Sequence, residues 1–146
     1  MTLEDSFEVD APPERVWALL SDIPRVAGCI PGAEITEVVD ASTYRAKVSV
    51  KVGPISVNYR ATIVVESLDE ADYIATLLVN GEELKGRGGM SARVTSRLEP
   101  TATGTRARLH TEAQISGIVA SVGGRLIESV ARKTVAAFAA KFATLL

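Results

Sequence analysis

The last part of the chain, residues 115–146, decides the fold: ISGIVASVGGRLIESVARKTVAAFAAKFATLL. Its apolar side chains recur mostly at steps of three or four residues, which is the period of one helix face. They are Val119, Val122, Leu126, Val130, Phe138, Phe142 and Leu145. From Ile118 onward the pattern predicts a single helix of about 30 residues and about 40 Å. Its charged residues argue against a membrane span.

Composition and charge limit the classes of protein to consider. The 146 residues predict a single domain over 1–146, and 47% apolar with 23% charged residues indicate a globular chain. A net charge of -2 argues against a nucleic-acid-binding protein. The single cysteine, Cys29, excludes an internal disulfide and favours a reducing compartment. Because no apolar segment opens the sequence, we expect neither a signal peptide nor a spanning helix, and therefore a cytoplasmic protein.

Upstream of the helix, the sequence shows the two-residue alternation of half-buried strands. An apolar run over 73–79 adds a segment whose facing is ambiguous, and Asn80-Gly81 after it predicts a hairpin turn. Pro13 and Glu14 predict the start of a short helix, and a second short helix or turn begins at Ser21. Five ranges alternate clearly and are predicted as strands: 2–10, 43–52, 55–66, 84–98 and 105–115.

A long apolar helix stripe and a sheet with one apolar face must bury each other. The predicted fold class is therefore α+β, with a curved antiparallel sheet wrapped around the long C-terminal helix. Two short helices follow the first strand in this arrangement. The sequence contains no internal repeat and no linker that would divide it.

The residues predicted to face the interior are unusually small. Close packing needs large side chains opposite small ones, and glycine inside a helix costs about 1 kcal/mol relative to alanine. Two readings remain open: an apolar cavity between sheet and helix, or glycine-mediated close approach with no cavity. The first reading assigns the space to Gly86, Gly88, Ala92, Gly123 and Gly124.

Several short motifs resemble the CoxG family, the G subunit of carbon monoxide dehydrogenase. They are APPERVW at 11–17, GCIPGA at 28–33, VGPI at 52–55, Gly86-Arg87-Gly88, Gly104-Thr105, and the stretch from Ser116-Gly117 to GGRLI at 123–127. The helix start at 11–17 is common to the wider START/Bet v 1-like superfamily. The 28–33 loop together with the 52–55 turn is more specific. The resemblance covers essentially the whole chain.

This resemblance implies a helix-grip fold that encloses a hydrophobic cavity, and an accessory role beside a molybdenum carbon monoxide dehydrogenase. The implied ligand is a respiratory quinone, menaquinone or ubiquinone, carried between the enzyme and the membrane, and no covalent cofactor is implied. Peripheral contact with the inner face of the plasma membrane follows as a further expectation. Related proteins accompany other molybdenum hydroxylases, so the partner enzyme is open to that extent.

The ligand is expected to contact apolar residues that face inward, with Tyr59 as a polar handle for a quinone carbonyl and Met90 as an adaptable contact. Each of these residues has plain core packing as its alternative reading. The predicted ligand-binding residues are Ile30, Val48, Tyr59, Leu77, Met90, Leu109, Val122, Leu126 and Val130.

Two other classes of function remain as alternatives. The first is an assembly or membrane-recruitment factor for the dehydrogenase that transports no ligand. The second is a cyclase or hydrolase, which needs titratable groups that face the interior. Strand parity turns His110 outward, Cys29 lacks a predicted base or a second metal ligand, and Asp5 is a misfit on the apolar side of its strand. We therefore expect no catalytic residue and no metal site.

The outer face of the sheet is predicted to be basic. It would suit anionic lipid or an acidic partner, or it is simply solvated. Ten cations lie there: Arg45, Lys47, Lys51, Arg60, Lys85, Arg87, Arg93, Arg97, Arg106 and Arg108.

Overall fold

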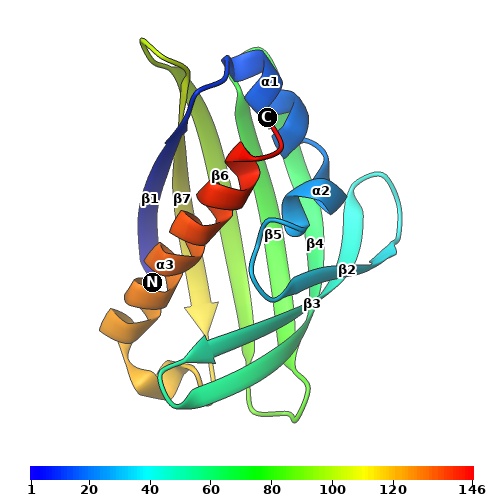
Figure 1. The fold of residues 1–146 in the computed structure, drawn as a ribbon. Coiled ribbons are helices and arrows are strands. Elements are labelled where there is room, and N and C mark those ends of the chain that lie inside the picture. Colours follow the sequence, from blue (N-terminus) through cyan, green and yellow to red (C-terminus); the bar gives the residue numbers. More distant parts are fainter.

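Seven strands form a single antiparallel sheet, which Figure 1 shows from the side that carries the helices. The computed structural model describes residues 1–146. The strand order is β1-β7-β6-β5-β4-β3-β2, so from β2 to β7 each strand pairs with the next one in the chain, and β1 pairs with β7. The strands are β1 (Thr2–Val9), β2 (Ala33–Val38), β3 (Thr43–Val52), β4 (Ile55–Asp69), β5 (Ile74–Glu83), β6 (Gly89–Pro100) and β7 (Thr105–Ile115).

Three helices lie on one side of this sheet: α1 (Pro13–Leu20), α2 (Ile23–Ala27) and α3 (Gly124–Ala143). Pro13 occupies the first turn of α1, where its missing N–H is tolerated, and Glu14 places a negative charge near the helix N-terminus. Figure 1 shows α3 crossing in front of the strands, while α1 and α2 cover the other end of the same face. The predicted α+β helix-grip class is confirmed.

The predicted start of the C-terminal helix is wrong. Residues 120–122 form a short 3-10 turn, and α3 begins only at Gly124 and spans 20 residues. The backbone of Gly123 has φ 92° and ψ 156°, a region that is essentially restricted to glycine. Gly123 and Gly124 therefore precede and open the helix, and the predicted cost of two glycines inside a helix does not arise.

The hairpin predicted at Asn80-Gly81 is also wrong. Asn80 pairs with Ser91 and Gly81 with Met90, so β5 continues to Glu83, and the turn to β6 occupies residues 84–88. A Cβ atom on Gly81 would lie 3.1 Å from Cγ of Met90, so this glycine allows side chains to approach the strand closely. The structure also contains the edge strand β2, which the sequence analysis did not predict.

The apolar side of the sheet is divided between two packed clusters. The first joins α1, β1, β7 and the C-terminal end of α3 through Phe7, Phe138 and Phe142, whose ring centroids lie 5.4–5.9 Å apart. The second joins β3 and β4 to the segment before α3 and contains Val52, Val57, Tyr59 and Val119. Phe142 is the one buried residue of α3, so the helix is anchored mainly at its C-terminal end.

Candidate functional site

An apolar cavity of about 320 Å³ lies between the sheet and the helices. Of its 21 lining residues, 17 are hydrophobic, and none carries a charge. Five aliphatic residues in the middle of the inner sheet face, the face toward α3, line it and belong to neither packed cluster. They are Ile63, Val65, Leu77, Val79 and Val94.

Cross-strand register explains how the sheet forms the floor of the cavity. One row across the sheet contains Val65, Leu77, Val94 and Thr111, which are directly paired on β4, β5, β6 and β7. The next row contains Leu68, Ala75, Ser96 and Leu109 on the same strands. Side chains of paired residues lie on the same side of a sheet, so both rows face the helices.

The helices and the segment after α2 form the roof. Its contributors are Trp17 and Leu20 of α1, Ser21, Ile23, Val26 and Ala27 around α2, Ile30, and Thr134, Val135 and Phe138 of α3. Most lining residues are buried or half-buried, whereas Ser21 and Leu68 are exposed, Leu68 to 53%. The cavity therefore opens to solvent between the α1–α2 junction and the end of β4.

Three of the predicted ligand-binding residues, Ile30, Leu77 and Leu109, line this cavity. The other six lie together at the opposite end of the inner face. They belong to the second packed cluster or pack against it: Val48, Tyr59, Met90, Val122, Leu126 and Val130. Tyr59 is 4% exposed there, and burial, together with the nearby Glu83 carboxylate, raises its pKa.

The residues predicted to provide space do not border the cavity. Gly86 and Gly88 lie in the β5–β6 turn, where a Cβ atom on Gly88 would clash with the carbonyl oxygen of Ser116. Ala92 is on the inner face of β6, paired with Val79 and Ala113, but outside the lining. Gly123 and Gly124 form the start of α3 and also lie outside it. The inward strand position predicted for Gly86 and Gly88 is therefore wrong.

The lining includes functional candidates that the sequence analysis missed, among them Trp17, Phe138, Ser96 and Thr111. A signal for two of them was present, because Ser96 and Thr111 have the inward parity of their strands. For Trp17 and Phe138 the helical pattern indicated burial, but not which of the buried helix residues would border empty space.

The titratable candidates lie elsewhere. His110 contacts the carboxylates of Glu4 and Glu112 on the outer face of the sheet, and the hydrogen bond to Glu4 is the main cause that raises its pKa. This confirms its predicted outward parity. Cys29 is 2% exposed in the first cluster, where its thiol contacts the carbonyl oxygen of Arg25 at 3.6 Å. Asp5 is half-buried opposite Leu109, and burial raises its pKa while Arg132 opposes the change.

The outer face carries the predicted cations, but five of the ten are paired with carboxylates. Arg45, Arg93, Arg106 and Arg108 contact Glu37, Glu66, Glu8 and Glu99, and Arg87 contacts Glu83. These pairs reduce the positive potential of the face. They weaken the reading of this face as a lipid-binding surface, and they leave an acidic partner or simple solvation.

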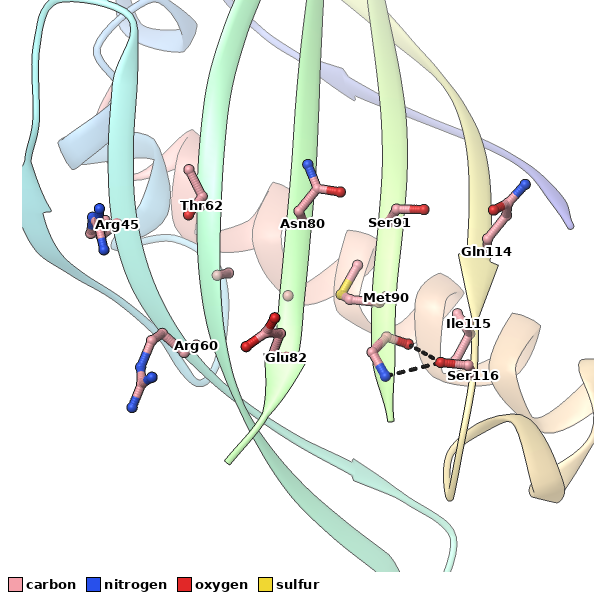
Figure 2. Close-up of a pocket in the computed structure, with 13 residues that line it drawn as sticks. Arg45, Arg60, Thr62, Asn80, Glu82, Met90, Ser91, Gln114, Ile115 and Ser116 are labelled. Carbon is pink, nitrogen blue, oxygen red and sulfur yellow. Dashed lines mark hydrogen bonds between the residues drawn. The ribbon is translucent and has the colours of Figure 1, made fainter. Parts of the chain in front are cut away.

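A second hollow, of about 670 Å³, lies over the outer face and is mostly polar. Figure 2 shows side chains of Thr62, Asn80, Ser91 and Gln114 in one row across adjacent strands, in the directly paired register of β4 to β7. Only three of the 13 residues lining this hollow are hydrophobic. An apolar ligand would gain little by entering it, so the smaller inner cavity is the candidate site.

No helix of the chain is both long and apolar enough to cross a lipid bilayer. Among solved structures, a conserved protein from Geobacillus kaustophilus has a TM-score of 0.87 and 27% identity, with 99% of this chain and 93% of that chain covered. The Zhui aromatase/cyclase from Streptomyces sp. R1128 has a TM-score of 0.65 and 16% identity, with 99% and 92% covered. Ara h 8.0201 has a TM-score of 0.59 and 17% identity, with 94% and 92% covered.

The last two similarities show the fold, because their sequence identity is low. Curated proteins give no significant match to this sequence. The family described as the G subunit of carbon monoxide dehydrogenase (CoxG) matches residues 6–146, which is almost the entire chain. This match, together with the helix-grip fold and its inner cavity, shows that the chain belongs to the CoxG family of carbon monoxide dehydrogenase, within the START/Bet v 1-like superfamily.

Proposed function

We propose that this protein is a non-catalytic carrier of a respiratory quinone, menaquinone or ubiquinone, which links a molybdenum carbon monoxide dehydrogenase to the membrane electron transport chain. The observation that carries the proposal is the apolar, uncharged cavity between sheet and helices. Quinones are uncharged and largely apolar, so they can enter such a cavity without leaving a buried charge unpaired.

The size and opening of the cavity suit the ring end of such a ligand. Its volume of about 320 Å³ lies at the lower end of the range for ligand pockets. A ring with a short part of an isoprenoid tail fills this space, and the rest of the tail leaves between Ser21 and Leu68. The exposed side chain of Leu68 offers an apolar surface along that path.

The chemistry of the lining favours a carrier over an enzyme. Its residues are Phe, Trp, Leu, Ile, Val, Ala, Ser and Thr, none of which is an acid or base near neutral pH. General acid–base catalysis uses a titratable group within hydrogen-bond reach of the substrate. The aromatase/cyclase with the same fold makes an enzyme the alternative class. Turnover of an added polyketide-like substrate by the purified chain would favour that alternative.

The family description supplies the proposed partner, a carbon monoxide dehydrogenase. A carrier between that enzyme and the quinone pool would work at the inner face of the plasma membrane, in peripheral contact with it. In this role the carrier binds the quinone, keeps it out of water and releases it, while the electron transfer itself occurs in the partner.

The single tryptophan of the chain allows a direct test, because Trp17 lines the cavity. We expect a short-tailed menaquinone to quench Trp17 fluorescence with saturation, and organic extraction of the purified protein to release a quinone detectable by mass spectrometry. Ala75→Phe fills the floor and should weaken binding at least about tenfold, which corresponds to about 1.4 kcal/mol. Ser91→Phe makes a similar change in the outer hollow and should bind as the unchanged protein does.

Two outcomes would contradict the carrier. A protein that is free of quinone and fails to quench with added menaquinone does not carry it. If Ala75→Phe abolishes menaquinone binding but still co-purifies with the dehydrogenase and supports its electron transfer to the membrane, the protein acts as an assembly or recruitment factor instead.

A further inference from the structure

Two hydroxyl groups interrupt the otherwise apolar floor of the cavity. We propose that Ser96 and Thr111 form a hydrogen-bonding subsite that selects an uncharged ligand with a carbonyl-type oxygen and holds this oxygen against β6 and β7. The inference rests on the proposed carrier function, and adds the chemical class of the ligand's polar end and its position in the cavity.

The four hydroxyl side chains of the lining differ in their hydrogen bonding. Ser21 Oγ donates to the carbonyl oxygen of Trp17, and Thr134 Oγ1 donates to that of Val130, each at 2.8 Å. The hydroxyls of Ser96 and Thr111 have no partner within the chain, although both residues line the cavity and are half-buried. No side-chain polar atom that is sealed from solvent lacks a partner, so these two hydroxyls are accessible from the cavity.

The register brings the two free hydroxyls onto the same part of the floor. Ser96 pairs with Leu109, and Thr111 pairs with Val94, so Ser96 and Thr111 are diagonal neighbours on adjacent strands. Diagonal neighbours on one face of a sheet lie about 7–8 Å apart and can reach a common group. Their other neighbours on the floor, Ala75 and Leu77, are apolar. A ligand oxygen is therefore the partner that the cavity itself leaves missing.

The chemistry of a hydroxyl group defines what it can bind here. A hydroxyl donates one hydrogen bond, and a carbonyl oxygen accepts up to two. A carboxylate would also accept these bonds, but it would bring a charge into a cavity that has no cation in its lining. The site therefore favours a quinone or ketone over a fatty acid, and over a pure hydrocarbon that leaves both hydroxyls without a partner.

The position of the pair also orients the ligand. Leu68, at the opening, and Ser96 belong to the same row of the floor and are separated by two strand spacings, which is about 10 Å. With its oxygen at Ser96 and Thr111, the ligand extends its apolar part across Ala75 toward Leu68. The polar end therefore enters first and the tail remains at the opening.

Calorimetric titration with three probes that share one ring system tests the subsite. The probes are 2-methyl-1,4-naphthoquinone, 2-methylnaphthalene and 2-naphthoate. We expect the quinone to bind more tightly than the hydrocarbon, and the naphthoate to bind most weakly. Thr111→Val and Ser96→Ala should each weaken quinone binding about two- to tenfold, the effect of one hydrogen bond, and leave the hydrocarbon affinity unchanged.

Matched variants separate hydrogen bonding from packing. Thr134→Val removes a hydroxyl from the same cavity that is already bonded to Val130, and it should keep the quinone preference. Thr111→Ser retains the hydroxyl and should keep most of the preference that Thr111→Val loses. A readout that compares two probes is insensitive to a general loosening of the fold.

The possible failures point to different causes. Equal binding of the quinone and the hydrocarbon by the unchanged protein overturns the subsite but leaves an apolar carrier. The subsite is likewise overturned if Thr111→Val weakens both probes equally, or if the naphthoate binds as well as the quinone. If none of the three probes binds and short-tailed menaquinone fails to quench Trp17, the proposed carrier function fails as a whole.

Discussion

Glu83 shows how one side chain can shape a turn. Its carboxylate accepts hydrogen bonds from Nε of Arg87 at 2.9 Å and from the backbone N–H groups of Lys85 and Arg87 at 3.0 and 3.1 Å. Arg87 in turn donates to the carbonyl oxygen of Ser56 at 3.2 Å, which ties the β5–β6 turn to the start of β4. The Glu83 side chain is 2% exposed, so its charge depends on these partners.

This arrangement predicts a pH dependence of stability. The Arg87 side chain, helped by the backbone N–H groups, lowers the pKa of Glu83 from 4.5 to about 2. The folded state binds this proton less readily than the unfolded state, so the stabilisation is complete above pH 4.5 and is lost as the pH falls toward 2. We expect Glu83→Gln to lower the melting temperature at pH 7, and the difference from the unchanged protein to shrink between pH 4.5 and 2.

Circular dichroism melts at a series of pH values measure this effect. Glu82→Gln is the control, because the neighbouring side chain is exposed and points to the outer face. It should leave the melting temperature at pH 7 nearly unchanged. A Glu83→Gln variant whose melting temperature at pH 7 equals that of the unchanged protein would contradict the assignment.

The candidate site was only partly predictable from single residues. Leu77 and Leu109 lie on strands whose alternation defined the inner face, and both line the cavity. Tyr59 has the same inward parity but lies in the second cluster, because parity indicates the face of a strand and not the position of a void along it. The positions of voids depend on how α3 crosses the sheet, and this crossing is set by contacts between distant parts of the chain.

Among the secondary-structure elements, α3 differs most from the prediction, and its first residues explain why. Gly117 and Gly123 have φ values of 80° and 92°, so the backbone between β7 and α3 turns twice at positions that favour glycine. A periodic apolar pattern continues through this region, but periodicity carries no information on φ. The same limit applies to Asn80-Gly81, where a typical turn dipeptide lies inside a strand.

The two glycines at the start of α3 should respond to substitution in opposite ways. Gly123→Ala forces a Cβ atom into a backbone region that costs about 1–3 kcal/mol for non-glycine residues. Gly124→Ala places its Cβ in ordinary contact with Met1, 3.5 Å away, and should stabilise the fold by up to about 1 kcal/mol. Urea denaturation measures both changes, and a Gly123→Ala variant as stable as the unchanged protein would refute the cap.

The molecule as a whole has a divided core, with the cavity beside the first cluster and five aliphatic floor residues outside both clusters. Packed interiors gain dispersion energy from close contacts, and the floor residues lack these contacts on one side. A ligand that fills the cavity restores them. The strands and the C-terminal end of α3 hold the fold together in the meantime.

Ligand binding should therefore raise the stability of the entire domain. With free 2-methyl-1,4-naphthoquinone at about 100 times its dissociation constant, linkage predicts a gain of about 2.7 kcal/mol. Differential scanning calorimetry with and without the quinone measures the gain. Ala75→Phe should show a much smaller one, and an unchanged melting temperature for the unmodified protein at saturating quinone would contradict binding to the native state.

The unfilled space has a mechanical consequence. Unfolding removes internal voids, so a protein that contains one occupies less volume when unfolded, and hydrostatic compression shifts its equilibrium toward the unfolded chain. The loaded form, with the void occupied, should tolerate compression better than the empty form. High-pressure fluorescence of Trp17 would then distinguish the two forms without any label, since the same indole reports both the guest and the collapse of its host.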